Sequence, residues 1–552
     1  METRTPARDA SVTVLELPAA LLRASFWRRH TDLAIIVALT LLAAVVRLWA
    51  LGAIPQGIHG DEAQVGIDAR RVLAEGWIGP YTLSALGQPA GHAYLTAPAI
   101  ELFGSTDWAV RLPLALVAVA AIPLAYALFR LQANRTVATM AAFLLAVSLW
   151  HIHYSRVAHW PISYVTVELA VLVLWTLALR RGQWYWFVAA GAVLGLGLYT
   201  YNVYPIFVFA FSAWVAVYTL VFKRRELMPW CRNVALAAVT AFVVGIPLFL
   251  YMADSDNDYF GHYRGYYQQY SVLQSKAYKE AGFSGKVDIV TGQAERFAGA
   301  YAWEGIIDFV DAASPDRRPM LDRVTLVLFL AGVAYAIGRW RETPHLMALM
   351  LVAIIPLTTV MQTNAVYRGP LGVVPFISFL AALPLALAWQ NAWRLRQKWR
   401  PLVLGGVIAL LAVMAVTNLR AYFDDWANSS VFPWVYAQQI SEASKYAAAQ
   451  PDRPYVYFLA GRWTWNYETR QYLARDVPGE DRSKEFGKRQ DFAVDRGRNS
   501  LILLLPPYLE RAEEVQALYP DARGYVKRDG DETLFIAYHV PALPPGRLGS
   551  AP

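Results

Sequence analysis

The feature that most constrains this chain is a series of eleven apolar runs, each about 18–22 residues long. A helix needs about 20 apolar residues to cross a bilayer, and its backbone polar groups have to be paired inside the helix. The runs predict membrane-spanning helices at 33–52, 107–129, 136–151, 162–179, 184–200, 204–222, 233–252, 323–338, 345–362, 370–390 and 401–419. The composition agrees, because 56% of the 552 residues are hydrophobic and 17% are charged. The fold class is therefore a polytopic α-helical membrane protein.

Basic residues in the short loops predict the orientation of these spans, because cytoplasmic loops carry an excess of Lys and Arg. The loop residues are Arg130, Arg135, Arg180, Arg181, Lys223, Arg224, Arg225, Arg232, Arg339, Arg341, Arg394, Arg396, Lys398 and Arg400. All five loops fall on the same side as the basic N-terminal segment. We expect a multi-pass plasma-membrane protein with a cytoplasmic N-terminus and an extracytoplasmic C-terminus. The net charge of +8 then indicates no nucleic-acid partner.

The longer segments divide the chain into three expected parts. Residues 1–32 form a cytoplasmic segment, 33–419 a transmembrane domain with outer loops 53–106 and 253–322, and 420–552 a soluble domain outside the membrane. In the last part, apolar strands alternate with helices, which predicts a small α/β domain. The strands are expected at 455–459, 501–505 and 533–540, and the helices at 431–449, 468–474 and 509–518.

Two adjacent carboxylates, Asp61 and Glu62, follow shortly after the first span. Charges beside hydrocarbon are costly to desolvate, so such a pair is more often functional than accidental. The pair suits a general base or a metal ligand, and His59 is near enough to join Glu62 in holding a divalent cation, Mg²⁺ or Mn²⁺. The alternative is structural, because acids also favour the N-terminus of a helix, here predicted from Asp61 to about Ala74.

Three arginines are expected on the same outer side. Arg368 is the strongest candidate for substrate binding, because a guanidinium suits a phosphate and arginine is disfavoured in outer loops. The alternative is a pair with a loop carboxylate. Arg111 and Arg156 either bind substrate or lie at the membrane interface. Tyr367 and His159 complete the predicted substrate-binding residues.

These features together resemble the GT-C glycosyltransferases that use lipid-linked sugars, and in particular the protein-mannosyltransferase and aminoarabinose-transferase-like branch. Asp61-Glu62 matches the acidic motif of the superfamily's first outer loop, and Ser105–Pro113 resembles the entry to its second span. The resemblance covers roughly residues 33–390. It implies a GT-C-like fold and an inverting transfer from a polyprenyl-phosphate sugar. Asp61 would be the general base, Glu62 would support it or help to hold a cation, and Arg368 would lie near the lipid phosphate.

One departure from the family concerns the second outer loop, where many relatives carry a further acid. Residues 156–161 contain none, and His159 stands near that place, which leaves metal dependence open. The implied acceptor is a lipid, a glycan such as a polysaccharide, or a protein. A transporter or flippase and a non-catalytic sugar-binding protein are the alternatives. Transporters place ionisable groups near mid-membrane, whereas the notable charges here lie at the outer interface, which favours the enzyme.

Overall fold

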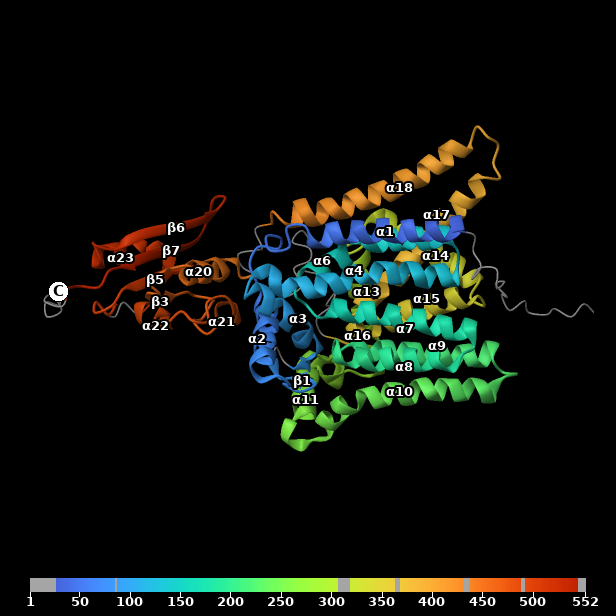
Figure 1. The fold of residues 1–552 in the computed structure, drawn as a ribbon, viewed down its shortest axis with the longest axis horizontal. Coiled ribbons are helices and arrows are strands. Elements are labelled where there is room, and N and C mark those ends of the chain that lie inside the picture. Colours follow the sequence, from blue (N-terminus) through green and yellow to red (C-terminus); the bar gives the residue numbers. More distant parts are fainter. Residues whose placement is uncertain are drawn as a thin grey trace, which may run out of the picture.

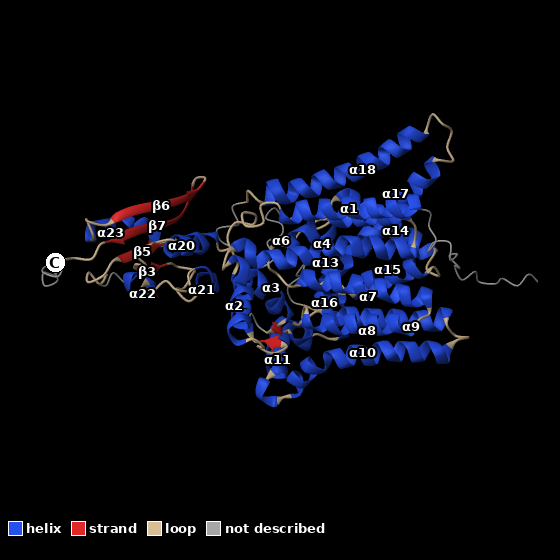
Figure 2. Ribbon diagram, in the orientation of Figure 1, coloured by secondary structure: helices blue, strands red, loops and turns tan. Residues whose placement is uncertain are grey.

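The computed structural model describes residues 26–84, 87–305, 318–362, 368–429, 436–487 and 492–544. Figure 1 shows a bundle of long helices packed side by side and a smaller unit that lies beyond one end of the bundle. Figure 2 shows that the bundle is almost entirely helical and that the larger sheet belongs to the smaller unit.

The bundle contains the apolar runs. Its long helices are α1 (Phe26–Leu48), α4 (Asp107–Gln132), α7 (Pro161–Arg181), α8 (Trp184–Leu196), α9 (Tyr204–Phe222), α10 (Leu227–Ala253), α14 (Arg323–Gly338), α15 (Thr343–Ile354), α17 (Val374–Ala392) and α18 (Arg400–Arg420). Helices α5 (Arg135–Ala146) and α6 (Leu149–Arg156) form a pair bent by 52°. Within the described residues, eight helices are long and apolar enough to cross a membrane, the bent pair makes a ninth, and α8 and α14 are shorter. The protein is therefore a multi-pass membrane protein, and each of the eleven runs falls on these helices.

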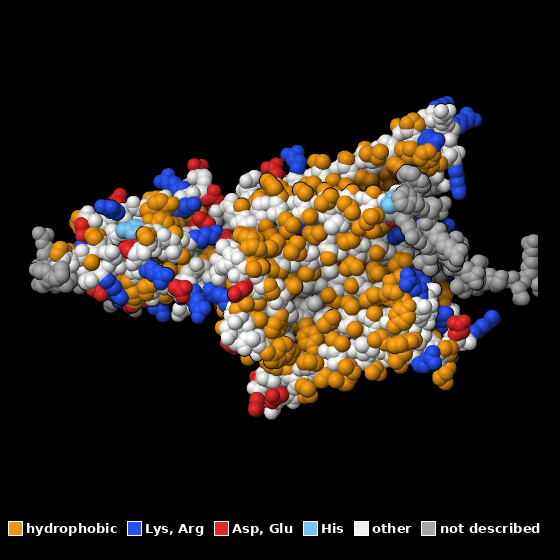
Figure 3. All heavy atoms as spheres, in the orientation of Figure 1, with side chains coloured by type: hydrophobic (Ala, Val, Ile, Leu, Met, Phe, Trp, Pro, Cys, Tyr) orange, Lys and Arg blue, Asp and Glu red, His pale blue; other side chains and the backbone are white. Residues whose placement is uncertain are grey.

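The surface of the bundle fits a bilayer. Hydrophobic side chains cover its sides in Figure 3, and Lys and Arg gather at the end away from the sheet unit. Helix α17 is largely enclosed by its neighbours, whereas α10 and α18 expose most of their side chains. Exposing apolar side chains to lipid costs little free energy, because hydrocarbon tails are as apolar as the side chains. The basic loops lie at one end as the sequence predicts, and the compartment that this end faces stays a prediction.

Short elements fill the two long connections of the bundle. The loop after α1 contains α2 (Gly60–Glu75), β1 (Tyr81–Thr82), β2 (Gln88–Pro89) and α3 (Gly91–Phe103). The segment between α10 and α14 contains α11 (Tyr259–Tyr270), α12 (Lys276–Glu280) and α13 (Phe283–Ala302), none of which was predicted. The remaining turns of the bundle are η3 (Gly197–Tyr199), η4 (Ser255–Asn257), η5 (Val272–Gln274), α16 (Leu357–Val360), η6 (Leu371–Val373) and η7 (Ala421–Trp426).

The smaller unit, from residue 436 onward, is called the sheet unit below. Its elements are α20 (Gln438–Ala448), β3 (Tyr455–Leu459), α21 (Glu468–Leu473), β4 (Gly479–Asp481), α22 (Ser483–Gly487), β5 (Ser500–Leu504), η8 (Tyr508–Arg511), α23 (Ala512–Leu518), β6 (Arg523–Asp529) and β7 (Glu532–Val540). The strand order is β4-β3-β5-β7-β6, with β3 parallel to β4 and β5, and β7 antiparallel to β5 and β6. Helices α20 and α21 face the bundle (Figure 1), and this contact positions the candidate site.

Candidate functional site

Helix α2 begins at the acidic pair, and its first turn is capped. The N–H of Asp61 donates to Nδ1 of His59 at 3.2 Å, and the N–H of His59 donates to Glu62 Oε2 at 3.3 Å. This reciprocal cap fixes where the helix starts. The predicted helix N-terminus is therefore confirmed, and of the two acids it is Glu62 whose side chain completes the cap.

Glu62 is also half of a buried ion pair with Arg111. Nε and Nη2 of Arg111 donate to its two oxygens at 3.0 and 2.9 Å, and the N–H of Ala158 donates to Oε1 at 2.6 Å. Together with the N–H of His59, four donors occupy the four or so lone pairs of this carboxylate. Glu62 therefore does not fit the predicted metal site with His59. Among the described residues, no group of three or more His, Cys, Asp or Glu side chains is placed to hold a metal ion.

Arg111 uses all five of its N–H groups inside the protein. Two donate to Glu62, and the others donate to the carbonyls of Leu51, Pro55 and Gly57. A guanidinium has five N–H donors, so none is left for a phosphate. These contacts do not support the predicted substrate role of Arg111 and show instead that it holds the segment leading to Asp61.

Arg156, like Arg111, donates hydrogen bonds to backbone carbonyls before α2. Its terminal nitrogens donate to the carbonyls of Val46, Trp49 and Ile54 at 2.9, 2.7 and 3.0 Å, and its guanidinium lies 5.0 Å from the ring centre of Phe423. The carbonyls belong to the end of α1 and the turn after it. The predicted substrate role of Arg156 is therefore not supported, because its terminal nitrogens bind backbone carbonyls in α1 and in the turn after it.

Asp61 differs from its neighbour, because its side chain is 29% exposed and its Oδ2 lies 3.8 Å from Nε2 of His159. Burial alone raises the pKa of Asp61, but the interactions with His159, His59 and Arg368 outweigh it and hold that pKa well below its usual range. Asp61 is therefore ionised at neutral pH. Arg368 contributes to the lowered pKa of Asp61, whereas Tyr367 lies outside the described residues.

His159 is buried and packs its ring on Trp160, with ring centres 4.8 Å apart. Neither ring nitrogen has a hydrogen-bond partner among the described residues. A small pocket beside it is lined by His59, Glu62, His153, Tyr154, Val157, His159 and Tyr436. Buried polar atoms without partners call for an explanation such as a bound water or ligand. His159, predicted to bind substrate, therefore lies beside Asp61, and its ring nitrogens make no hydrogen bond within the described residues.

Three further polar residues near this place were missed by the sequence analysis. Gln88, His92 and Thr96 are buried, and their side-chain polar atoms lack hydrogen-bond partners among the described residues. The ring of His92 packs on Trp160 at 5.0 Å, and burial lowers the pKa of His92 to about 4, so it is neutral at pH 7. Helical spacing could not have linked all three, because Gln88 lies on β2 whereas His92 and Thr96 lie on α3.

Part of the chain matches a known protein family. The family model described as "Dolichyl-phosphate-mannose-protein mannosyltransferase" matches residues 87–251. The Bacillus subtilis (strain 168) protein described as "Putative mannosyltransferase YkcB" is 31% identical over 113 residues, which are 19% of this chain and 16% of that relative. The chain therefore matches well under two thirds of the relative's length.

The solved structures that resemble the chain cover much more of it. ArnT from Cupriavidus metallidurans in the apo state has a TM-score of 0.54 at 17% identity and covers 91% of this chain and 97% of its own. The same protein bound to undecaprenyl phosphate has a TM-score of 0.55 at 16% identity, with the same shares covered. At this identity the likeness shows a shared fold. The chain therefore has the GT-C-like fold that the resemblance in the sequence implies, and the family model matches less than half of its length.

Proposed function

We propose that this protein transfers a sugar from a polyprenyl-phosphate donor to an extracytoplasmic acceptor, with inversion, and that Asp61 is the general base. The observation that carries the proposal is the division of the acidic pair. Four donors occupy the carboxylate of Glu62, whereas Asp61 is partly exposed and its Oδ2 lies 3.8 Å from Nε2 of His159. The undecaprenyl phosphate bound by ArnT, which shares the fold, supports a polyprenyl-phosphate donor. The acceptor is a glycolipid, a polysaccharide or a protein.

The reaction needs two functions from the protein. Asp61 takes the proton of an acceptor hydroxyl while that oxygen bonds to the anomeric carbon of the sugar. The bond from the anomeric carbon to the phosphate oxygen breaks, and its electron pair leaves with the lipid phosphate. Attack from the face opposite the phosphate inverts the anomeric centre. Arg368 neutralises the charge that grows on the departing phosphate, for which its guanidinium is suited.

The charge around Asp61 fits this sequence of events. A base has to be ionised before it accepts a proton, and the lowered pKa of Asp61 ensures that it is ionised. A low pKa also makes a weak base. A lipid phosphate bound near Arg368 adds negative charge and therefore raises the pKa of Asp61 toward the range in which proton transfer is efficient. Binding of the donor thus makes Asp61 a stronger base.

The place of the site in the bundle suits a lipid donor. Helix α2, which carries Asp61, lies at the end of the bundle next to the sheet unit, opposite the end where Lys and Arg gather (Figures 1 and 3). By the preference of basic loops for the cytoplasm, the site faces the outside of the plasma membrane. A polyprenyl-phosphate sugar reaches such a site within the bilayer, so no nucleotide sugar has to cross it.

The test is transfer by the purified protein in lipid nanodiscs, supplied in turn with a panel of polyprenyl-phosphate sugars and candidate acceptors. Released lipid phosphate and glycosylated acceptor are measured by mass spectrometry. We expect one donor to be consumed and Asp61→Asn to lower turnover by about 10²–10⁴-fold. The matched control is Asp68→Asn on the same helix, whose carboxylate accepts hydrogen bonds from Gln64 and Ser84.

Two results would contradict the proposal. If Asp61→Asn keeps full transfer activity, Asp61 is not the base. If the wild-type protein binds a donor but releases no lipid phosphate with any acceptor, the protein is a sugar-binding protein without transfer chemistry.

A further inference from the structure

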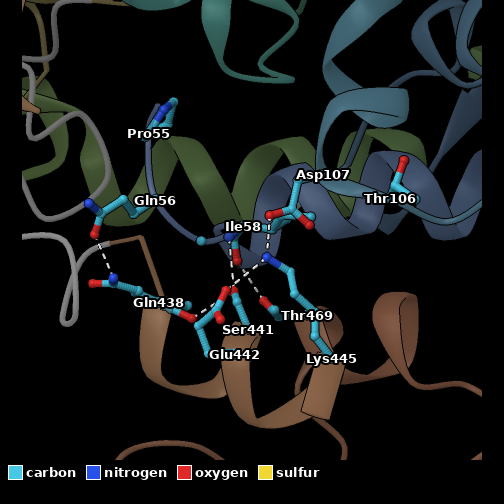
Figure 4. A network of polar contacts seen from close by, with 12 residues as sticks. Pro55, Gln56, Ile58, Thr106, Asp107, Gln438, Ser441, Glu442, Lys445 and Thr469 are labelled. Atoms are coloured by element: carbon cyan, nitrogen blue, oxygen red, sulfur yellow. Dashed lines mark hydrogen bonds and ion pairs between the residues drawn. The ribbon is translucent and has the colours of Figure 1, made fainter. Parts of the chain in front are cut away.

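We propose that the sheet unit is a positioning element for Asp61 and that it acts through the backbone of Ile58. The inference rests on the proposed function, in which Asp61 is the base. The N–H of Ile58 donates to Oγ of Ser441 at 2.9 Å, and Oγ1 of Thr469 donates to the carbonyl of Ile58 at 2.8 Å. Figure 4 shows both bonds between the turn before α2 and the helices of the sheet unit.

The two bonds restrain Ile58 on both sides. Ser441 lies on α20 and Thr469 lies on α21, so different helices hold the donor and the acceptor of the same residue. Ile58, Ser441 and Thr469 are all fully buried. A shift of the turn would leave buried polar groups without partners, which is costly in the protein interior. Ile58 stands three residues before Asp61. Restraining Ile58 therefore restrains where in space the first turn of α2 lies.

Two glycines let the sheet unit approach this closely. Gly57 has a φ of +82°, which L side chains rarely adopt, and a Cβ there would lie 2.5 Å from the carbonyl oxygen of Tyr436. At Gly60, a Cβ would lie 2.7 Å from the hydroxyl of Tyr467. The two positions flank Ile58, so the backbone of the turn is shaped for contact with the sheet unit.

The bundle holds the same turn from its other side. Arg111 donates to the carbonyls of Leu51, Pro55 and Gly57, and the sheet unit takes both backbone groups of the next residue, Ile58. Each of the two parts therefore restrains a different stretch of the chain that enters α2. The position of Asp61 depends on both.

Other contacts join the sheet unit to the bundle without involving the turn. Nζ of Lys445 lies 2.6 Å from Oδ2 of Asp107, and the hydroxyl of Tyr472 donates to the carbonyl of Thr106 at 3.0 Å. Arg70 on α2 donates to the carbonyl of Tyr472 at 3.1 Å. These contacts keep the sheet unit in place when the hydroxyls at Ile58 are removed, so such variants test positioning and not docking.

The experiment compares Thr469→Val, Thr469→Ser and Ser441→Ala in the full chain in nanodiscs. Valine keeps the shape of threonine but cannot donate, whereas serine can. The matched control is Ser500→Ala, because Ser500 is a buried hydroxyl of the same unit that donates to the carbonyls of Asp495 and Arg498. All variants are first checked for an unchanged melting temperature of the sheet unit.

We expect Thr469→Val and Ser441→Ala each to lower kcat by about 10–100-fold, since misplacing a reacting group by about 1 Å costs about that much. The KM for the donor stays unchanged, Thr469→Ser restores most of kcat, and Ser500→Ala leaves it unaltered. Hydrogen–deuterium exchange of the peptide that contains residues 57–60 should be faster in Thr469→Val and Ser441→Ala than in the wild type.

The inference is overturned if exchange is faster but kcat is unchanged, or if Thr469→Ser fails to restore kcat. It is also overturned if exchange at 57–60 is unaltered in both variants. Failure of the proposed function gives a different result, because the wild-type protein would then transfer no sugar while the exchange measurement still reports whether the sheet unit holds Ile58.

Discussion

Glu62 and Arg111 form an ion pair with two hydrogen bonds inside the protein, and both side chains are almost fully enclosed. This ion pair distinguishes two neighbouring acids that look equivalent in the sequence, because Glu62 takes part in it and Asp61 does not. Glu62 holds the turn before α2 together, and the side chain of Asp61 stays 29% exposed. The structural interpretation of the acidic motif therefore fits Glu62, and the functional interpretation stays a prediction for Asp61.

Removing the charge of Glu62 should destabilise the protein. Glu62→Gln leaves the buried guanidinium of Arg111 without a countercharge, and breaking such a pair costs about 3–5 kcal/mol. We expect a clear fall of the melting temperature in detergent. The control is Glu75→Gln, which removes an exposed pair with Arg71 on the same helix and should cost at most about 1 kcal/mol. Equal melting temperatures for the two variants would contradict the structural role of Glu62.

Arg368 should act on the donor phosphate. Arg368→Ala is expected to raise the KM for the donor and to lower kcat, together by about 10–100-fold, because a hydrogen bond to a charged group contributes about 1.5–3 kcal/mol. Arg368→Lys keeps the charge but loses the fork of donors, so its kinetics should be intermediate. Arg318→Ala, which breaks a partly exposed pair with Asp425, is the control. Unchanged donor kinetics in Arg368→Ala would rule out the phosphate contact.

The pH dependence of transfer should reveal the influence of His159 on Asp61. The folded-state pKa of Asp61 is lowered, so its charge adds stability that is complete above the unfolded pKa of about 3.9 and is lost as the pH falls through the folded value. The acid limb of kcat/KM should therefore lie below pH 3.9 or so. His159→Gln removes the main interaction that lowers this pKa and should move the acid limb to higher pH.

The control for this profile is His539→Gln, in the sheet unit, where the ring of His539 contacts the hydroxyl of Tyr446. It should leave the acid limb in place. If the acid limbs of the wild-type protein and His159→Gln coincide, His159 does not lower the pKa of Asp61.

Gly57 and Gly76 allow a test of the contact with the sheet unit. Both have positive φ angles, of 82° and 76°, so alanine should cost about 1–2 kcal/mol of backbone strain at either position. A Cβ at Gly76 meets nothing within 4 Å, whereas at Gly57 it meets the carbonyl of Tyr436. We expect Gly57→Ala to be the more destabilising and to speed hydrogen exchange in α20. Equal effects of the two substitutions would mean that the close approach at Gly57 does not matter.

The accuracy of the sequence analysis varied with the kind of element. Strand β3 was predicted at its observed bounds, because five apolar residues between turn signals have few alternatives. Helix α13 was missed, since three glycines and several polar residues weaken its helical pattern. Strand β6 was missed because it is a largely exposed edge strand, and such a strand needs no apolar alternation.

For the candidate site, the sequence singled out residues but did not predict their contacts. The sequence singled out Asp61, Glu62, Arg111, Arg156, His159 and Arg368, and the structure brings them to one end of the bundle. Their contacts could not be predicted, because loop charge and helix spacing say on which side a residue lies and not which acceptor it meets. Gln88, His92 and Thr96 were missed for that reason, as polar residues become notable once they are buried without partners.

The sequence by itself determined the membrane-spanning architecture and the place of the acidic pair. An apolar run of about 20 residues in lipid has to be helical, because no water is there to pair its backbone, and this rule needs no knowledge of distant residues. The tertiary structure alone decided that Arg111 takes Glu62 and leaves Asp61, and that Ser441 and Thr469 hold Ile58. Arg111 and Glu62 are 49 residues apart, and Ser441 and Thr469 are 383 and 411 residues from Ile58. These contacts form because each buried donor takes the acceptor that packing brings within reach.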